Sequence, residues 1–175
     1  MKFIIRQPSI ADIPDMARVH VETWRTTYRG IIADSFLEYL SLQKHLERHQ
    51  KYMAMPGTIY SVAEVEGQRL VGFLSGGPKR DASFVQAGEL YAINILEQHR
   101  RSGIGAAMKR QWANNLRNAN INAGYVWVLA ANQPAVTFYE KLGAKFVREQ
   151  MIQIGGQSLR ELAYGWDDLR ALTDP

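Results

Sequence analysis

The sequence of 175 residues predicts a mixed α/β fold built as one domain over residues 1–175. Apolar residues recur at helical spacing in some segments and alternate, or run together, in shorter ones. The second half of the chain orders such segments as strand, helix, strand and helix, and hairpins flank them. We therefore expect a largely antiparallel sheet of about six to seven strands with one central parallel pair, flanked by about four helices.

The first half of the chain combines short strands with amphipathic helices. Three strands are expected there, at residues 3–6, 58–65 and 70–75. Two helices are expected, one with apolar positions over residues 13–24 and one from about residue 34 to residue 52. Ser9 or Asp12 can cap the first helix, because both side chains accept hydrogen bonds from backbone amides. The two later strands form a hairpin, after which residues 76–78 (GGP) break the chain.

The second half of the chain supplies the parallel pair. Its strands are expected at residues 89–96, 125–129, 146–154 and 159–166. A helix from about residue 103 to residue 118 joins the first two strands, which therefore run parallel. Pro134 begins a further helix, and Gly143 is placed to end it. Residues 125–129 are almost continuously apolar, which is typical of a strand that is buried on both faces.

The composition excludes several classes of protein. The chain has no cysteine, which excludes disulfides, thiolate metal sites and a cysteine nucleophile, and which is typical of a cytosolic protein. No histidine–carboxylate cluster has metal-ligand spacing, so we expect no metal. The longest apolar run, at residues 125–131, is far shorter than the ~20 residues of a membrane helix, so we expect a cytoplasmic protein.

Positive charge is concentrated in one stretch of the sequence. Residues 98–149 contain eight basic and two acidic residues, in a chain whose formal net charge is only +4. Such a block suggests an anionic ligand, although a solvated basic surface would give the same count. Within this block, Lys141 and Lys145 are expected to be solvated side chains.

The turn Arg100-Arg101-Ser102-Gly103-Ile104-Gly105-Ala106 lies between an expected strand and an expected helix. Its glycines let the backbone approach a ligand, and the helix presents unpaired N–H groups that suit a pyrophosphate. A Walker A loop is excluded because no Gly-Lys-Ser/Thr follows. A Rossmann fingerprint is excluded because Met108 stands where its third small residue belongs and no acidic residue follows at the required distance. A plain strand–helix turn that needs glycine stays an alternative.

At this turn the sequence resembles the GNAT superfamily of N-acetyltransferases. Members share an Arg/Gln-x-x-Gly-x-Gly/Ala signature after their fourth strand, and Arg100, Gly103 and Gly105 match it. A second family element follows in order, formed by Asn132 and residues 138–143 (FYEKLG). The two motifs together, each on the expected element, indicate membership of the family.

The resemblance extends more loosely over the full length, including residues 20–32, and it has two departures. Many members carry proline where this chain has Glu97 and glycine where it has Arg101. Glu97 places a carboxylate near the expected phosphates. Neither change removes a hydrogen-bond donor that the cofactor needs.

The resemblance implies acetyl-CoA as the acetyl donor. Its pantetheine arm is then expected to pair like an extra strand with the backbone of Ile93, Asn94 and Ile95, and Asn132 to contact the pantetheine side. The pyrophosphate is expected to bind the phosphate turn, residues 100–106. The implied donors there are the side chains of Arg100 and Arg101 and the backbone of Arg101, Ser102, Gly103, Ile104, Gly105 and Ala106.

The resemblance also implies direct attack of an amine on the thioester, without an acyl-enzyme. An ammonium group with a pKa near ~10.4 must first lose a proton, and the leaving thiolate, near pKa ~8.5, benefits from a proton donor. Tyr139 holds the family's general-acid position, with packing against Phe138 as the alternative. Glu89 is a possible general base, acting directly or through water, with an exposed strand-end glutamate as the alternative. The backbone amide near Ile95 is placed to polarise the thioester carbonyl.

His20, Trp24 and Tyr28 share one helical face, so they are candidates for the wall of an acceptor pocket, with core packing as the alternative. The sequence thus predicts an N-acetyltransferase that acts on a primary amine of a small molecule or peptide. Two alternatives are an acyl-CoA-binding protein without acetyl turnover and a transferase of a different acyl group. A nucleic-acid binder is disfavoured because no RNA- or DNA-binding signature accompanies the charge. No membrane partner is expected, and a homodimer is possible because family members often form one.

Overall fold

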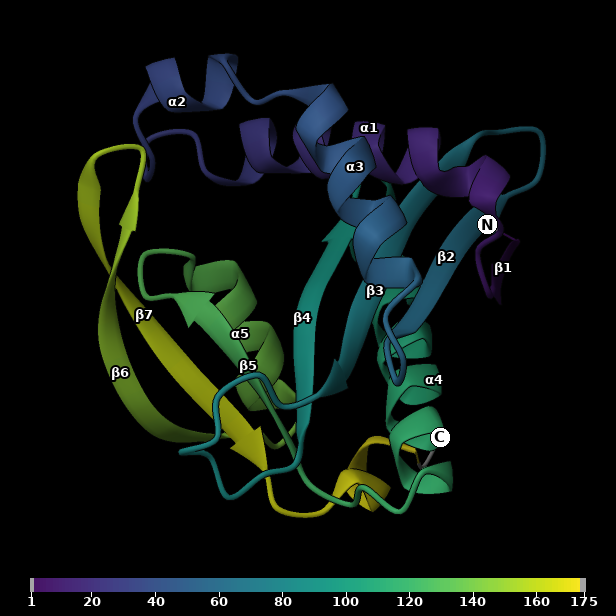
Figure 1. Cartoon of the computed structure of the whole chain (residues 1–175), viewed down its shortest axis with the longest axis vertical. Coiled ribbons are helices and arrows are strands. Elements are labelled where there is room, and N and C mark those ends of the chain that lie inside the picture. Colours follow the sequence, from purple (N-terminus) through teal and green to yellow (C-terminus); the bar gives the residue numbers. More distant parts are fainter. Residues whose placement is uncertain (1, 174–175) are drawn as a thin grey trace.

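Seven strands form one continuous sheet in the computed structural model, which describes residues 2–173 (Figure 1). The strands are β1 (Phe3–Arg6), β2 (Ile59–Val65), β3 (Leu70–Pro78), β4 (Gly88–Ile95), β5 (Gly124–Leu129), β6 (Lys145–Ile154) and β7 (Gln157–Trp166). They follow the order β1-β2-β3-β4-β5-β7-β6, and every neighbouring pair is antiparallel except β4 and β5. The predicted fold class is therefore confirmed, including the parallel pair within the sheet.

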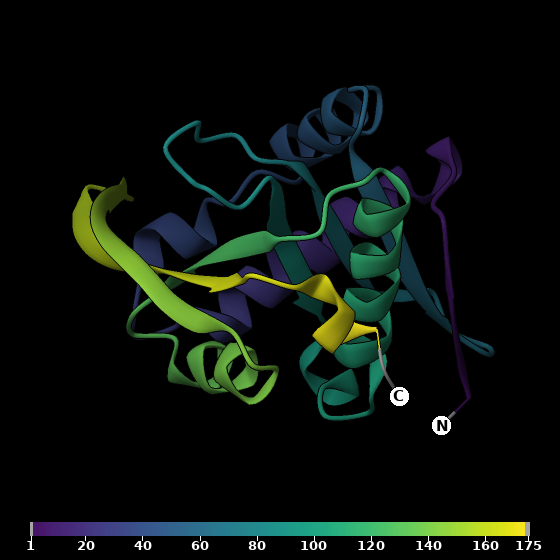
Figure 2. The same ribbon diagram turned by 90° about the horizontal axis from the view of Figure 1, so that it is seen from below.

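Helices cover both faces of this sheet. Within residues 2–173 they are α1 (Ile13–Thr27), α2 (Asp34–Glu38), α3 (Leu42–Met53), α4 (Ile104–Asn118) and α5 (Gln133–Lys141). Helices α1 and α3 pack on each other, and α1 packs on β3 and β4, whereas α4 packs on β1 to β4. Helix α5 is tied to β7 by the Tyr164 hydroxyl, which donates to the Glu140 carboxylate at 2.8 Å. In Figure 2, α3 and α5 lie on opposite sides of β5 and β7.

Two expectations about the first half of the chain are wrong in detail. The single helix expected at residues 34–52 is two helices, because the Ser41 hydroxyl caps α3 by accepting the Lys44 N–H at 3.2 Å. The break expected at residues 76–78 is the end of β3, which continues to Pro78. Gly76 is needed inside that strand, because any side chain there would collide with the indole of Trp112 on α4.

A β-bulge in β4 determines which residues face the site. The register of β4 against β3 shifts at Tyr91, which is the extra residue on β4. Because of this extra residue, the side chains that follow Tyr91 point to the opposite face of the sheet from the one that regular alternation would give them. Leu90 before it packs into the main core, and Ile93 and Ile95 after it approach Gly105 of α4. The second half of β4 therefore presents apolar side chains to the start of α4.

Strands β4 and β5 pair only at their beginnings. Their ladder joins residues 88–90 to residues 124–126, and within residues 2–173 no further pairing connects the two strands. Figure 1 shows them diverging beyond this point. The edge of β4 at residues 91–95 thus keeps backbone N–H and C=O groups without a strand partner on that side.

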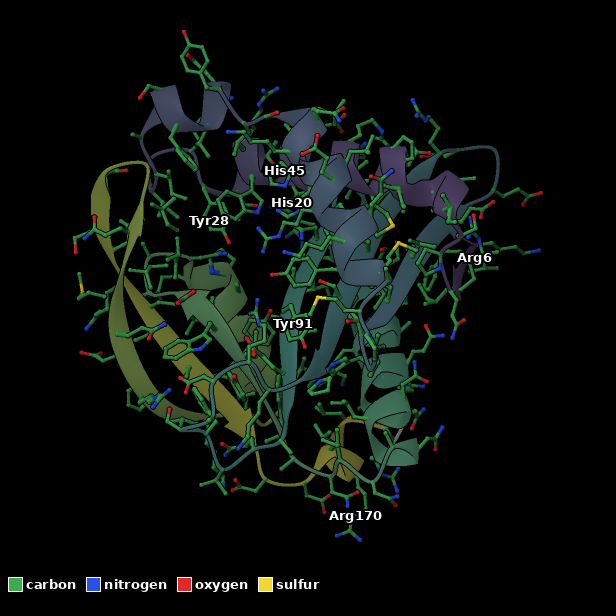
Figure 3. The ribbon with its side chains drawn as sticks, in the orientation of Figure 1. Arg6, His20, Tyr28, His45, Tyr91 and Arg170 are labelled. Carbon is green, nitrogen blue, oxygen red and sulfur yellow. The ribbon has the colours of Figure 1, made fainter. Side chains whose placement is uncertain are left out.

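Three histidines fill the contact between α1 and α3. The rings of His20 and His45 lie 4.1 Å apart, and His20 and His49 approach to 3.4 Å between their ring nitrogens (Figure 3). Burial, with the neighbouring cationic groups, lowers the pKa of His20 to about 2 and that of His49 to about 4. His20 is thus part of the packing under α1, as the core alternative for that residue proposed.

This cluster predicts a loss of stability in mild acid. The unfolded chain protonates its histidines below about pH 6.5, whereas the folded chain resists protonation down to about pH 4 at His49, so stability falls as the pH drops through that window. The loss is about 1.4 kcal/mol per pH unit for each such group, or ~2 kcal/mol at pH 5. The free energy of unfolding is measured with urea at pH 7 and at pH 5. The decrease between the two pH values should be smaller in His49→Gln than in the wild type, by ~2 kcal/mol. Equal pH dependence in the variant and the wild type would contradict the assignment.

Candidate active site

The turn of residues 100–106 leads into an open helix N-terminus. Gly103 is the N-cap of α4 in the left-handed region, at φ 88°, and no side chain caps this helix. The N–H groups of Ile104, Gly105 and Ala106 in the first turn are thus donors for an anion at the positive end of the helix dipole. Arg101 also has a left-handed backbone, at φ 58°, a conformation that non-glycine residues rarely adopt outside special turns.

The two glycines of the signature have different structural roles. A side chain at Gly103 would meet no atom within 4 Å, so glycine is needed there for its backbone conformation. A side chain at Gly105 would begin 3.4 Å from Ile95, 3.5 Å from Phe138 and 3.8 Å from Ile93. Gly105 therefore keeps open the space between α4, α5 and the second half of β4.

Arg100 is bound within the chain. Its guanidinium donates to the Thr27 hydroxyl at 2.7 Å and to the Ile95 carbonyl at 3.2 Å. It thereby ties the phosphate turn to the end of α1 and to the end of β4. The phosphate contact expected from Arg100 stays a prediction, because the guanidinium would have to give up these hydrogen bonds to bind a phosphate. The side chain of Arg101 is exposed. The Ser102 hydroxyl donates to the His99 carbonyl at 2.6 Å, so its side chain stabilises the turn.

Tyr139, Asn132 and Tyr28 come together beside the diverging strands. Asn132 is the N-cap of α5 and accepts the Ala135 N–H at 3.4 Å, and its side chain is close enough to the Tyr28 hydroxyl to lower the pKa of that group. Tyr28 reaches this point from the end of α1 (Figure 3). Burial raises the pKa of both tyrosines, with Tyr28 adding to the effect on Tyr139. Both hydroxyls therefore stay protonated at neutral pH.

Glu89 is buried rather than exposed, so the surface alternative for this residue is wrong. Its carboxylate accepts hydrogen bonds from the Arg80 guanidinium at 2.5 Å, the Arg80 backbone N–H at 2.9 Å and the Tyr125 hydroxyl at 2.8 Å. Only 3% of its side chain is exposed, against 44% for Arg80. The Arg80 guanidinium also lies over the Tyr91 ring, 4.2 Å from its centre. These contacts fix the carboxylate at the point where β4 and β5 still pair.

Two hollows lie along β5, one beside β4 and the other at the end of β5 next to β7. One of them, of about 360 Å³, is called the acceptor cleft. It is lined by Arg80, Asp81, Glu89, Leu90, Tyr91, Tyr125, Trp127, Gln150 and Glu161. The other, of about 320 Å³, is mainly apolar and is lined by Ile31, Leu129, Ala130, Ala131, Leu159 and Arg160. Trp24 and Tyr28 are half-buried in the apolar cluster around Leu129, so they lie near the second hollow as well as in a packed contact.

A family model described as the acetyltransferase (GNAT) family matches residues 19–144. The chain belongs to the GNAT acetyltransferase family. YuaI of Bacillus subtilis (strain 168), named as an uncharacterized N-acetyltransferase, is 38% identical over 168 residues, which are 96% of this chain and 95% of YuaI. The chain is therefore an acyltransferase, as the sequence predicted.

Solved structures show the same GNAT fold. The PaiA N-acetyltransferase from Thermoplasma acidophilum, in complex with coenzyme A, matches with a TM-score of 0.71 at 21% identity, over 92% of this chain and 98% of that one. The ribosomal-protein-alanine N-acetyltransferase from Brucella melitensis matches with a TM-score of 0.73 at 22% identity, over 93% of this chain and 98% of that one.

The sequence contained the GNAT signature residues in a recognisable pattern, but of the residues that line the acceptor cleft it predicted only Glu89. The charged and hydroxyl groups missed include Arg80, Tyr125 and Glu161. Arg80 lies in the loop before β4, which has no periodic pattern. Tyr125 and Glu161 lie on strands, where each fits the ordinary alternation of apolar and polar residues. One signal was present for Tyr125: a polar hydroxyl on a strand that is buried on both faces needs a partner. The structure shows this partner to be Glu89, which stands opposite Tyr125 in the parallel pair.

Residues 2–173 of this GNAT protein contain no group of three or more histidine, aspartate or glutamate side chains that could hold a metal ion. Over the same residues, no helix has the length and apolar character that crossing a membrane requires.

Proposed function

We propose that this chain transfers the acetyl group of acetyl-CoA to a primary amine, with Tyr139 as general acid and Glu89 as general base. The observation that carries the proposal is the meeting of an unpaired strand edge with an open helix N-terminus, beside two buried groups that can exchange protons. A pantetheine arm requires strand-like partners and a pyrophosphate requires clustered N–H donors. Both are present at adjoining places in the fold.

The cofactor contacts follow from this arrangement. The edge of β4 at Ile93, Asn94 and Ile95 binds the amides of the pantetheine arm, and Asn132 contacts its other side. The backbone of residues 101–106 binds the pyrophosphate, supported by the exposed Arg101 side chain. Gly105 leaves space for the arm where it passes between α4, α5 and β4.

The chemistry is a direct transfer. Glu89 takes a proton from the acceptor ammonium, directly or through water, and the neutral amine attacks the thioester carbon. A carbon–nitrogen bond forms, the carbon–sulfur bond breaks, and Tyr139 donates a proton to the departing sulfur. The attacking nitrogen gives up its remaining extra proton, which restores the Tyr139 hydroxyl directly or through water, and the proton held by Glu89 is released to solvent. The amide near Ile95 stabilises negative charge on the carbonyl oxygen during attack. Trp24 and Tyr28 contribute to the wall on the acceptor side.

The activity is tested by mixing the protein with acetyl-CoA and a panel of amines and following the release of free thiol. Amine-dependent thiol release together with formation of the acetylated amine supports the proposal. Tight binding of CoA with no turnover on any amine in the panel would favour the acyl-CoA-binding alternative instead.

Gly105→Val tests the cofactor site. The branched side chain would fill the space next to Ile95 and Phe138, so the affinity for CoA measured by calorimetry should fall at least ~10-fold, about 1.4 kcal/mol. Gly105→Ala is the matched control, because a single Cβ there meets its neighbours at ordinary van der Waals distances. Unchanged affinity in a folded valine variant would place the cofactor elsewhere.

A further inference from the structure

The charges that line the acceptor cleft are not balanced. Arg80 pairs with Glu89, and Asp81 forms an ion pair with Arg148. Glu161 accepts one hydrogen bond, from the Gln150 amide at 3.1 Å, and among residues 2–173 no lysine or arginine forms an ion pair with it. Within the described residues, the cleft therefore contains one carboxylate without an ion-pair partner, on which the charge of Arg80 acts only from a longer distance.

The position of Glu161 relates it to the reaction centre. Glu161 pairs with Leu129 on β5, while Glu89 pairs with Tyr125 on the same strand. Four residues of β5 separate these levels, so the backbone positions of the two glutamates lie about 13 Å apart along the strand direction, while both side chains line the acceptor cleft. Glu161 thus stands at the level where β4 and β5 have separated, and its charge contributes to the raised pKa of Tyr28.

The surroundings of Glu161 favour a cationic ligand. Burial is the main cause that raises the pKa of the Glu161 carboxyl, and the charge of Glu89 adds to it, while the Gln150 hydrogen bond and the charge of Arg80 act in the opposite direction. Burial therefore makes the negative charge of Glu161 costly. A ligand cation would compensate that cost, because a charge-assisted hydrogen bond is among the stronger polar contacts. Tyr91 and Trp127 add aromatic surface to the same cleft, suited to a short methylene chain.

We propose that Glu161 binds a second cationic group of the acceptor, so that this enzyme prefers diamines and other amines that carry an additional positive charge. The inference rests on the proposed function for its location in the acceptor cleft. Glu161 is then a specificity-determining residue, and proton transfer from the reacting amine belongs to Glu89.

The test compares two acceptors of similar length. Putrescine carries two ammonium groups, and in n-pentylamine a methyl group replaces the second one. Wild type should acetylate putrescine with a kcat/KM about tenfold or more above that for pentylamine. Glu161→Gln keeps the volume and the hydrogen bond to Gln150, and it should reduce this preference to about twofold or less, mainly through a higher KM for putrescine.

The matched control is Glu149→Gln on the neighbouring strand β6. Glu149 is exposed and pairs with Arg160 outside the acceptor cleft, so its loss should leave both acceptors unaffected. Equal losses of kcat with both acceptors in Glu161→Gln would overturn the inference, because they would indicate a proton-transfer role. An unchanged preference in that variant would overturn it as well.

Equilibrium binding separates this inference from the proposed function. Calorimetric titration of putrescine into the CoA-bound protein should show weaker binding in Glu161→Gln than in wild type, whether or not turnover occurs. Binding that depends on Glu161 without any acetylation would overturn the proposed function and support the inference. Acetylation of both amines with equal efficiency by wild type would support the proposed function and overturn the inference.

Discussion

Replacing Tyr139 with phenylalanine should lower kcat by roughly 10²–10⁴, the usual contribution of a general acid. The change removes one oxygen and almost no volume. The ring should therefore keep its contact with Trp166, whose centre lies 6.1 Å away, and the fold should be preserved. KM for acetyl-CoA should change far less than kcat, because the lost interaction forms only as sulfur leaves.

The environment of Tyr139 supports this assignment. Its side chain is 5% exposed, and burial raises the pKa of its hydroxyl, so the proton is present over the whole pH range in which amines react. A phenol with a raised pKa is a weaker acid than a thiol in water, so the proton transfer requires that burial in the same site also raises the basicity of the departing sulfur.

Tyr164→Phe is the matched control for Tyr139→Phe. Tyr164 also packs against α5, but its hydroxyl donates to Glu140 away from the acceptor cleft, so its loss should leave kcat nearly unchanged. If Tyr139→Phe keeps more than about half of the wild-type turnover while chemistry limits the rate, Tyr139 is a packing residue. The sulfur would then take its proton from water.

Local sequence rules predicted the parts of this structure that depend on neighbouring residues. The turn at residues 100–106 was predictable because glycines between a strand and a helix indicate a sharp change of chain direction, and Gly103 does adopt a left-handed conformation. The parallel pair of β4 and β5 followed from the helix that connects them. Pro134 likewise marked the start of α5, which begins at Gln133.

Features that depend on tertiary contacts were not predictable in this way. The bulge at Tyr91 arises from the pairing of β4 with β3, and a single strand shows no sign of it. The burial of Glu89 depends on Arg80, which reaches it from a loop, and on Tyr125 of the next strand in the sheet. Glu161 joins the same cleft only because β7 inserts beside β5.

Glu89→Gln should lower kcat/KM by roughly 10²–10⁴ if the carboxylate is the general base. Glutamine has nearly the same shape and still accepts hydrogen bonds from the Tyr125 hydroxyl and the Arg80 backbone, but it cannot take a proton at neutral pH. The partner left without its counter-charge is Arg80, which is 44% exposed and can be solvated. The fold and CoA binding should therefore survive.

The pH profile separates a catalytic from a structural role for Glu89. In the wild type, kcat/KM for the amine should fall at low pH as the base is protonated, and Glu89→Gln should lose the part of this acid limb that belongs to the base. Tyr125→Phe is the matched control, because it removes one hydrogen bond to Glu89 and keeps the carboxylate with Arg80. That variant should retain most of its activity and its acid limb. An active Glu89→Gln enzyme with an unchanged acid limb would assign the base to another group and reduce Glu89 to the ion-pair partner that holds Arg80 over the ring of Tyr91.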